Sequence, residues 1–154
     1  MKKLVQVICD LLCSMMIGCS LPSASKKDVK KYVIVKQLDY ASIDEIAVAI
    51  ENELKESDET AEVEIYSDQN DQSTLMQTGK QAVTDRADII IPLGTLAAQT
   101  MVVVSEDTEI PVVYATISDP EAASLTGIDR VTGTSDALNT KQFVDMMLKQ
   151  NPNL

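Results

Sequence analysis

The stretch IIIPLGTLAAQT, residues 89–100, decides the fold of this chain. A run of apolar residues reaches Leu93, and then Gly94 and Thr95 precede a segment of small and apolar residues with helical character. Apolar residues at successive positions are typical of a central parallel strand that helices cover on both faces. The stretch therefore predicts a buried strand that turns directly into a helix. Nothing bulky blocks the first backbone N–H groups of that helix.

The alternation of strand and helix continues in both directions along the chain. Short apolar or β-branched runs predict strands at residues 32–37, 61–67, 88–93 and 110–117, and a shorter strand that ends at Ser135 and Asp136. Amphipathic segments predict helices at residues 42–57, 72–86, 95–107 and 139–150. We expect Ser42 to cap the first helix, and Asn139 or Thr140 to cap the last. This alternation is typical of a doubly wound α/β fold with a mainly parallel sheet, in which the alternating strand 61–67 lies at an edge and strand 110–117 is fully buried.

The composition excludes several classes of function. The 154 residues carry a net charge of −11, which argues against nucleic acid as a partner, because phosphate binding requires clustered Lys and Arg. The chain contains no His, which excludes Ser-His-Asp and Cys-His catalysis and His-ligated metals. No glycine-rich phosphate-binding motif follows a predicted strand. We therefore expect no enzyme activity, no cofactor and no metal, in a chain long enough for one domain or half of a two-lobed protein.

The N-terminal residues have the pattern of a secretory signal. Two lysines precede a short apolar stretch from Leu4 to Ile17, which leads to Gly18 and Cys19 and is too short to span a membrane. The ending MIGC resembles a bacterial lipobox, in which the Cys becomes the lipid-bearing first residue of the mature protein. We expect a lipoprotein signal peptide at residues 1–18, lipidation of Cys19, and a flexible tether at residues 19–31. The alternative is a signal without lipidation, in which Cys19 is incidental.

Short polar side chains follow several of the predicted strands. In an open α/β sheet, ligands bind beyond the C-terminal ends of the strands, near the point where the strand order reverses. The residues expected there are Gln37, Leu38, Asp39 and Tyr40; Gly94, Thr95 and Leu96; Thr116, Ser118 and Asp119; and Thr134, Ser135 and Asp136. Hydroxyls, carboxylates and one aromatic ring dominate this set, which contains no catalytic base with a tuned partner.

This set of groups suits a small zwitterion. Gly94 allows close approach of a ligand, and the N-terminus of the helix that follows favours an anion such as a carboxylate. Asp119 or Asp136, or both, are placed to meet an ammonium group, and Tyr40 supplies an apolar or stacking wall. A carboxylate and an ammonium together describe an amino acid. The alternative is that these junctions serve only to turn the chain and to cap helices.

Several longer segments resemble one family of proteins. They are KQLDYASIDE, DQNDQSTLMQTGKQAVTDRADIIIPLGTLAAQT, IPVVYATISDPEAASL and VTGTSDALNTKQFVDMMLKQNPN. In this order and spacing they resemble the ABC-transporter substrate-binding lipoproteins of the tryptophan/tyrosine type, which have the type 1 periplasmic-binding-protein fold. The segment DPEAASLTG departs from the family pattern, which usually has glycines after Asp-Pro.

The resemblance implies a two-lobed protein whose ligand is clamped between the lobes. Residues 32–154 correspond to the first lobe only, and the second lobe is expected beyond Leu154. Carried over position by position, the ligand contacts of the first lobe are Gln37, Tyr40, Thr95, Gln99, Ser118, Asp119, Ser135 and Asp136. The resemblance further implies an amino acid ligand, with the aromatic amino acids as candidates, and an ABC permease as partner.

Together these observations predict a solute-binding component of an ABC importer. We expect it to be extracytoplasmic and held at the bacterial cell membrane by a lipid anchor. A ligand-binding lobe of an extracytoplasmic sensor, without a role in transport, is the alternative. The lipid on Cys19 discriminates between the two, because it counts against a soluble sensor.

Overall fold

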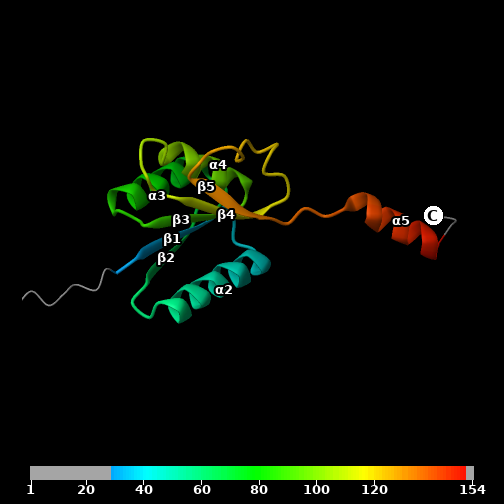
Figure 1. Ribbon diagram of the computed structural model, residues 1–154, viewed down its shortest axis with the longest axis horizontal. Helices are drawn as coiled ribbons and strands as arrows, with labels where there is room; N and C mark the ends of the chain where they lie inside the picture. The colour runs from blue at the N-terminus through cyan, green and yellow to red at the C-terminus, as the bar shows by residue number, and fades with distance from the viewer. Residues whose placement is uncertain (1–28, 152–154) are drawn as a thin grey trace, which may run out of the picture.

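The computed structural model describes residues 29–151, which form a parallel five-stranded sheet with helices on both faces (Figure 1). In chain order the elements are β1 (Lys31–Lys36), α2 (Ala41–Ser57), β2 (Glu62–Ser67), α3 (Gln72–Thr84), β3 (Ile89–Leu93), α4 (Thr95–Val104), β4 (Val112–Ile117), β5 (Val131–Ser135) and α5 (Thr140–Gln150). The strand order is β2-β1-β3-β4-β5. The doubly wound α/β fold predicted from the sequence is confirmed, with β2 at an edge and β3 in the centre.

Two apolar layers hold the helices on the sheet. On one face, Val33 and Val35 of β1 pack with Leu75 of α3 and Met101 of α4. On the other face, Ile34 packs with Ala47 of α2. Alternate residues of a strand point to opposite faces, so an unbroken apolar run such as β1 is what a strand covered on both sides requires.

Strand β4 is less buried than the sequence suggested. Val112, Tyr114 and Ile117 are buried, whereas Val113 and Ala115 are only half-buried. The buried positions pack with α4 and with the segment between β4 and β5, through residues such as Leu125. On the opposite face, Val113 and Ala115 stay half-buried, so this face of β4 is covered only in part. The prediction of a fully buried strand at residues 110–117 is therefore wrong.

The first predicted helix cap is also wrong. Helix α2 begins at Ala41, its N-cap is Tyr40, and no side chain caps it. Ser42 therefore lies inside the first turn. Asp44 in that turn complements the positive end of the helix, which stabilises the helix start without a capping box. At the other end of the chain, Asn139 caps α5 by accepting a hydrogen bond from the backbone N–H of Gln142 (3.0 Å), as one of the two predicted alternatives.

Helix α5 lies apart from the sheet. Figure 1 shows it at the end of an extended segment, and none of its residues is buried. Its exposed apolar side chains include Phe143 and Met146. With Leu138, they border an open hollow of about 430 Å³ along the helix. This hollow is larger than the one at the strand ends described below, but a single exposed helix and the segment before it form its walls.

Removing α5 should leave the stability of the sheet nearly unchanged. We expect a chain that ends at Ala137 to match the intact chain in its free energy of unfolding within about 0.5 kcal/mol, because α5 buries none of its own residues. Urea denaturation followed by far-UV circular dichroism measures this quantity. As a control for sensitivity, Leu125→Ala should cost about 2–5 kcal/mol, because Leu125 is fully buried. A loss of comparable size on removal of α5 contradicts the prediction.

The predicted signal peptide at residues 1–18, the lipidated Cys19 and most of the tether at residues 19–31 lie outside the described residues, and they stay predictions. No helix within residues 29–151 is both long and apolar enough to cross a membrane. In the same range, no three His, Cys, Asp or Glu side chains are grouped so that they could hold a metal ion.

Candidate functional site

The C-terminal ends of the strands form one rim of the sheet, because all the strand pairs are parallel. The chain leaves β1 toward β2 on one side, and it crosses from β2 to β3 on the other side of β1. The strand order therefore reverses between β1 and β3. Open α/β sheets bind their ligands at such a point.

A pocket of about 250 Å³ lies at this reversal. It is lined by three of the residues predicted to bind ligand, namely Gln37, Tyr40 and Thr95. The other lining residues are Leu38, Ile43, Leu93, Gly94 and Thr116. Tyr40 is 62% exposed, so its ring forms an open wall of the pocket. The sequence therefore predicted the place of this pocket and part of its lining.

Gln37 occupies the position that the sequence left for a ligand. Its Oε1 accepts a hydrogen bond from the backbone N–H of Leu96 (2.8 Å), in the first turn of α4, and its Nε2 donates to Asn70 Oδ1 (2.8 Å). The expectation that the first N–H groups of this helix are free is thus wrong for Leu96. The side chain of Gln37, which directly follows β1, caps α4 although it lies 59 positions before Leu96 in the sequence.

Gly94 permits this arrangement. Its φ is +107°, a conformation that residues with a side chain rarely adopt. A Cβ atom on Gly94 would lie 2.7 Å from Gln37 Oε1 and 2.9 Å from Gln37 Cβ. The glycine therefore serves the close approach of the Gln37 side chain to the backbone, rather than the direct approach of a ligand alone.

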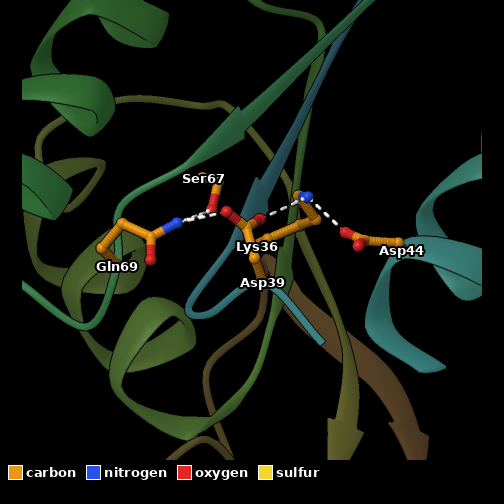
Figure 2. Close-up of polar contacts among 5 residues, drawn as sticks. All are labelled: Lys36, Asp39, Asp44, Ser67 and Gln69. Carbon is orange, nitrogen blue, oxygen red and sulfur yellow. Dashed lines mark hydrogen bonds and ion pairs between the residues drawn. The ribbon is translucent and has the colours of Figure 1, made fainter. Parts of the chain in front are cut away.

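A charged network fixes the connection that carries Gln37 and Tyr40. Figure 2 shows Lys36 between two carboxylates, with its Nζ donating to Asp39 Oδ1 (2.7 Å) and to Asp44 Oδ1 (2.5 Å). The other oxygen of Asp39 accepts from Gln69 Nε2, which also donates to Ser67 Oγ (3.0 Å). The network ties the segment between β1 and α2 to the end of β2 and to the first turn of α2.

The pKa values in this network follow from these contacts. The hydrogen bond from Lys36 lowers the pKa of Asp39 below its ordinary value, with further hydrogen bonds acting in the same direction. The hydrogen bonds to Asp39 and Asp44 raise the pKa of Lys36. Lys36 therefore stays charged and paired at neutral pH, and its charge is used within the protein.

Three further predicted residues meet at the ends of β4 and β5. Ser118 Oγ donates to Asp136 Oδ1 (2.8 Å), and Ser135 Oγ donates to the backbone oxygen of Ser118 (3.2 Å). Ser135 Oγ also accepts from the backbone N–H of Ala137 (3.1 Å). All three predicted side chains are exposed. They form a polar cluster on the same rim, two strands along from the reversal.

The last two predicted residues support the backbone beside this cluster. Asp119 Oδ1 accepts from the N–H of Ala122 (2.9 Å), which is ordinary turn chemistry. Gln99 Nε2 donates to the backbone oxygen of Ala123 (3.1 Å). Neither Asp119 nor Gln99 lines the pocket. Of the eight predicted residues, three line the pocket, three form the polar cluster and two support the backbone, and their contact with a ligand stays a prediction.

Thr116 is a pocket residue that the predicted contacts did not include. It stood among the strand-end residues, but nothing in the local sequence marked its conformation. Its φ is +59°. It lies where the pairing of β4 with β5 is irregular, between Tyr114 and Ile117. Such bulges commonly redirect a side chain next to a functional site.

Asp68 is a buried carboxyl group at the same end of the sheet, directly after β2. It is 3% exposed, and its Oδ1 accepts from Thr78 Oγ1 (2.9 Å). Its Oδ2 has no hydrogen-bond partner within the part of the chain that the structure describes. Burial raises the pKa of Asp68 above its ordinary value, because the charged form loses hydration.

Asp68→Asn should therefore stabilise the protein at neutral pH. Since the folded pKa lies above the unfolded value of 3.8, Asp68 stabilises the fold most below that value, and this contribution is lost as the pH rises through the folded pKa. We expect the free energy of unfolding of the asparagine variant to exceed that of the parent by about 1 kcal/mol at pH 7. The decline in stability that Asp68 causes above pH 4 should be absent from the variant. Urea denaturation at pH 4, 5.5 and 7 tests it.

Asp71→Asn is the matched control in the same turn. The pKa of Asp71 is lowered, mainly by the hydrogen bond from the backbone N–H of Thr74, so its contribution is present above 3.8 and lost as the pH falls. The two variants should thus change the pH dependence in opposite directions. An Asp68→Asn protein that is less stable than the parent at pH 7 contradicts the prediction.

Known proteins resemble this chain in sequence and in fold. The chain is 26% identical over 158 residues to a tyrosine-binding protein of Clostridioides difficile strain R20291, covering 90% of this chain and 45% of that protein. A crystal structure of an ABC domain in complex with L-Trp, from Streptococcus pneumonia, matches 81% of this chain and 44% of its own with 28% identity and a TM-score of 0.71. The ligand-free, open structure of a Clostridium difficile substrate-binding protein with adhesive properties shares the fold, with 24% identity, a TM-score of 0.71, and cover of 81% of this chain and 45% of that one.

These comparisons agree on the family of the chain and on the share of each relative that it covers. The chain spans about half the length of the relatives that it matches, at 44–45% of each. The model of one family, described as ABC transporter substrate binding protein, matches residues 31–154. The resemblance inferred from the sequence is confirmed: the chain belongs to the ABC transporter substrate-binding protein family, a class of binding proteins rather than enzymes.

Proposed function

We propose that this chain captures an amino acid, of the aromatic class, for an ABC importer. The observation that carries the proposal is the pocket at the reversal between β1 and β3, which combines the apolar side chains of Leu38, Ile43 and Leu93 with the exposed ring of Tyr40. An aromatic side chain is flat and apolar, and it suits such walls. The tyrosine-binding and L-Trp-bound relatives support this choice of ligand.

The polar cluster at the ends of β4 and β5 complements the pocket. Asp136 offers a carboxylate for the ammonium group of an amino acid, and Ser118 and Ser135 hold the backbone around it. The pocket and the polar cluster lie on the same rim of the sheet, so we expect a single ligand to place its apolar side chain in the pocket and its charged end at the cluster.

Binding by this chain should be weak. The chain spans about half of its relatives, and a pocket open on one side supplies only part of the contacts and desolvation that a closed site supplies. We expect dissociation constants for L-Trp and L-Tyr weaker than micromolar. Two-dimensional ¹H–¹⁵N NMR titration is suited to this range and locates the contact by residue.

In this titration, L-Trp and L-Tyr should shift the amide signals around Gln37, Gly94 and Thr116, and L-Glu should leave them in place because the pocket lining carries no charge. The amide of Gly127, in an open turn, is the internal reference. Shifts confined to other parts of the chain, or none with either aromatic amino acid, contradict the proposed function. Micromolar or tighter binding contradicts the argument from the open pocket.

We further propose that the chain works outside the cytoplasmic membrane, anchored by lipid on Cys19, and delivers its ligand to a membrane permease. The support is the lipobox-like MIGC ending in the sequence and the family to which the chain belongs. Mass spectrometry of the mature N-terminus tests it. A diacylglyceryl group on Cys19 is expected, and a mature protein that begins elsewhere refutes the anchor and favours the soluble sensor.

A further inference from the structure

The pocket at the reversal of the strand order has an uncharged lining. All of its lining side chains are apolar, amide, hydroxyl or phenol groups. The nearby ammonium group of Lys36 is paired with Asp39 and Asp44. Burying a charge without a partner is costly, so the pocket suits the uncharged side chain of a ligand better than its zwitterionic end.

The polar groups of the pocket differ in what they offer a ligand. Tyr40 and Thr95 are exposed, so water can bind their hydroxyl groups. Both ends of the Gln37 amide are engaged, with Leu96 and Asn70. Thr116 differs, because its Oγ1 is covered and has no hydrogen-bond partner among the residues from 29 to 151. A hydroxyl group can donate one hydrogen bond and accept others, so all of this capacity is unused.

The backbone at Thr116, which lines the pocket, has an unusual conformation. A β-branched residue with a φ of +59° is rare and strained, by about 1–3 kcal/mol in general. Such strain persists only where the surrounding structure imposes it, here at the irregular pairing of β4 with β5. Thr116 lines the pocket but its Oγ1 is covered, so contact with a ligand requires a rotation about χ1, and this rotation breaks no hydrogen bond within the described chain.

We propose that the pocket receives the ring of an aromatic amino acid and that the Thr116 hydroxyl binds the polar group on that ring, the phenol O–H of tyrosine or the indole N–H of tryptophan. The inference rests on the proposed function and extends it to specificity. A site built to bind a ligand O–H or N–H disfavours the analogue that lacks it, because its own polar group then stays unpaired. Phenylalanine is that analogue, and it differs from tyrosine only in the ring hydroxyl.

The test crosses two ligands with two side chains. L-Tyr and L-Phe are titrated into the intact chain and into its Thr116→Val variant, which keeps the shape of the side chain and removes the hydroxyl. Initial slopes of the NMR shifts, at concentrations below the solubility of tyrosine, give relative affinities. The parent chain should prefer L-Tyr about fivefold, in line with one hydrogen bond of ordinary strength. The valine variant should lose this preference, and Thr116→Ser, which retains the hydroxyl, should keep it.

Each outcome is decisive. A Thr116→Val protein that still prefers L-Tyr as strongly as the parent overturns the role of Thr116 and leaves the proposed function standing. A parent chain that binds both amino acids equally does the same. Absence of binding by any aromatic amino acid overturns the proposed function and this inference together. If Thr116→Val fails to fold, as its NMR spectrum shows, Thr116→Ala removes the hydroxyl with a smaller side chain and takes its place.

Discussion

Replacing Gly133 with alanine should lower the free energy of unfolding by at least about 3 kcal/mol, the upper range for overpacking a well-packed site. A Cβ atom on Gly133 would lie 2.1 Å from the backbone oxygen of Tyr114 and 2.4 Å from its ring carbon Cδ2. Gly133 is paired with Tyr114 across β4 and β5, and Tyr114 is itself buried, so neither side can yield easily. The overlap can be relieved only by parting the two strands.

Urea denaturation of Gly133→Ala measures this loss, and Gly127→Ala is its control. Nothing lies within 4 Å of a Cβ built on Gly127, so this change carries only the backbone cost of its φ of +75°, about 1–2 kcal/mol. Equal effects of the two substitutions would show that packing against Tyr114 is not the reason for the glycine. The same parting of strands should also break the hydrogen bond between Ser118 and Asp136, which removes the polar cluster of the proposed site.

The second large effect is expected at Gly94. Alanine there must adopt a φ of +107° and a ψ of 155°, a region occupied almost only by glycine, at a cost of about 1–3 kcal/mol. Its Cβ atom also displaces the Gln37 side chain, and loss of the hydrogen bond to Leu96 adds about 1 kcal/mol. We therefore expect a total loss of about 3 kcal/mol in stability, measured by urea denaturation, together with weaker binding of L-Trp.

A double substitution separates these two contributions. Gln37→Ala removes the atoms that collide with the new Cβ, but it leaves the backbone conformation of Gly94 unchanged. In the Gly94→Ala background it should therefore cost about 1 kcal/mol less than in the parent chain. Strict additivity of the two changes would mean that Gln37 and Gly94 do not act on each other, contrary to the contact described above.

The alternation of strands and helices and the mainly parallel sheet could be predicted because the signals are local. The run at residues 89–93 is apolar at successive positions, and only a strand covered on both faces tolerates this. The cap of α5 at Asn139 is likewise set by neighbouring residues. Short-range patterns therefore sufficed to predict whether each element is a helix or a strand.

The details that failed depend on residues far apart in the sequence. The amide of Leu96 is satisfied by Gln37, which is 59 positions away, so the segment around Leu96 gives no sign of it. The partial exposure of β4 depends on where other helices fall, and not on its own residues. The positive φ of Thr116 occurs at the irregular pairing of β4 with β5, and the local sequence around this threonine does not indicate it.

The position of the candidate pocket could be predicted from the sequence better than the hydrogen bonding of its side chains. Gln37, Tyr40 and Thr95 were placed at the rim by strand ends alone, and they do line one pocket. Which hydroxyl is unused could not be foreseen, because it depends on how every neighbouring donor and acceptor is paired. Ser118 and Ser135 were expected to be as available as Thr116, yet both are engaged within the protein.

The parallel direction of all five strands has a consequence for how such proteins diversify. Every residue of the proposed site stands at or beyond a strand end or in the first turns of a helix, and the buried layers beneath contain none of the polar ones. New ligand preferences can thus arise by exchange of a few connecting residues, while the apolar layers that fold the chain stay as they are. Relatives that diverge widely in these connections should still superimpose over their sheets.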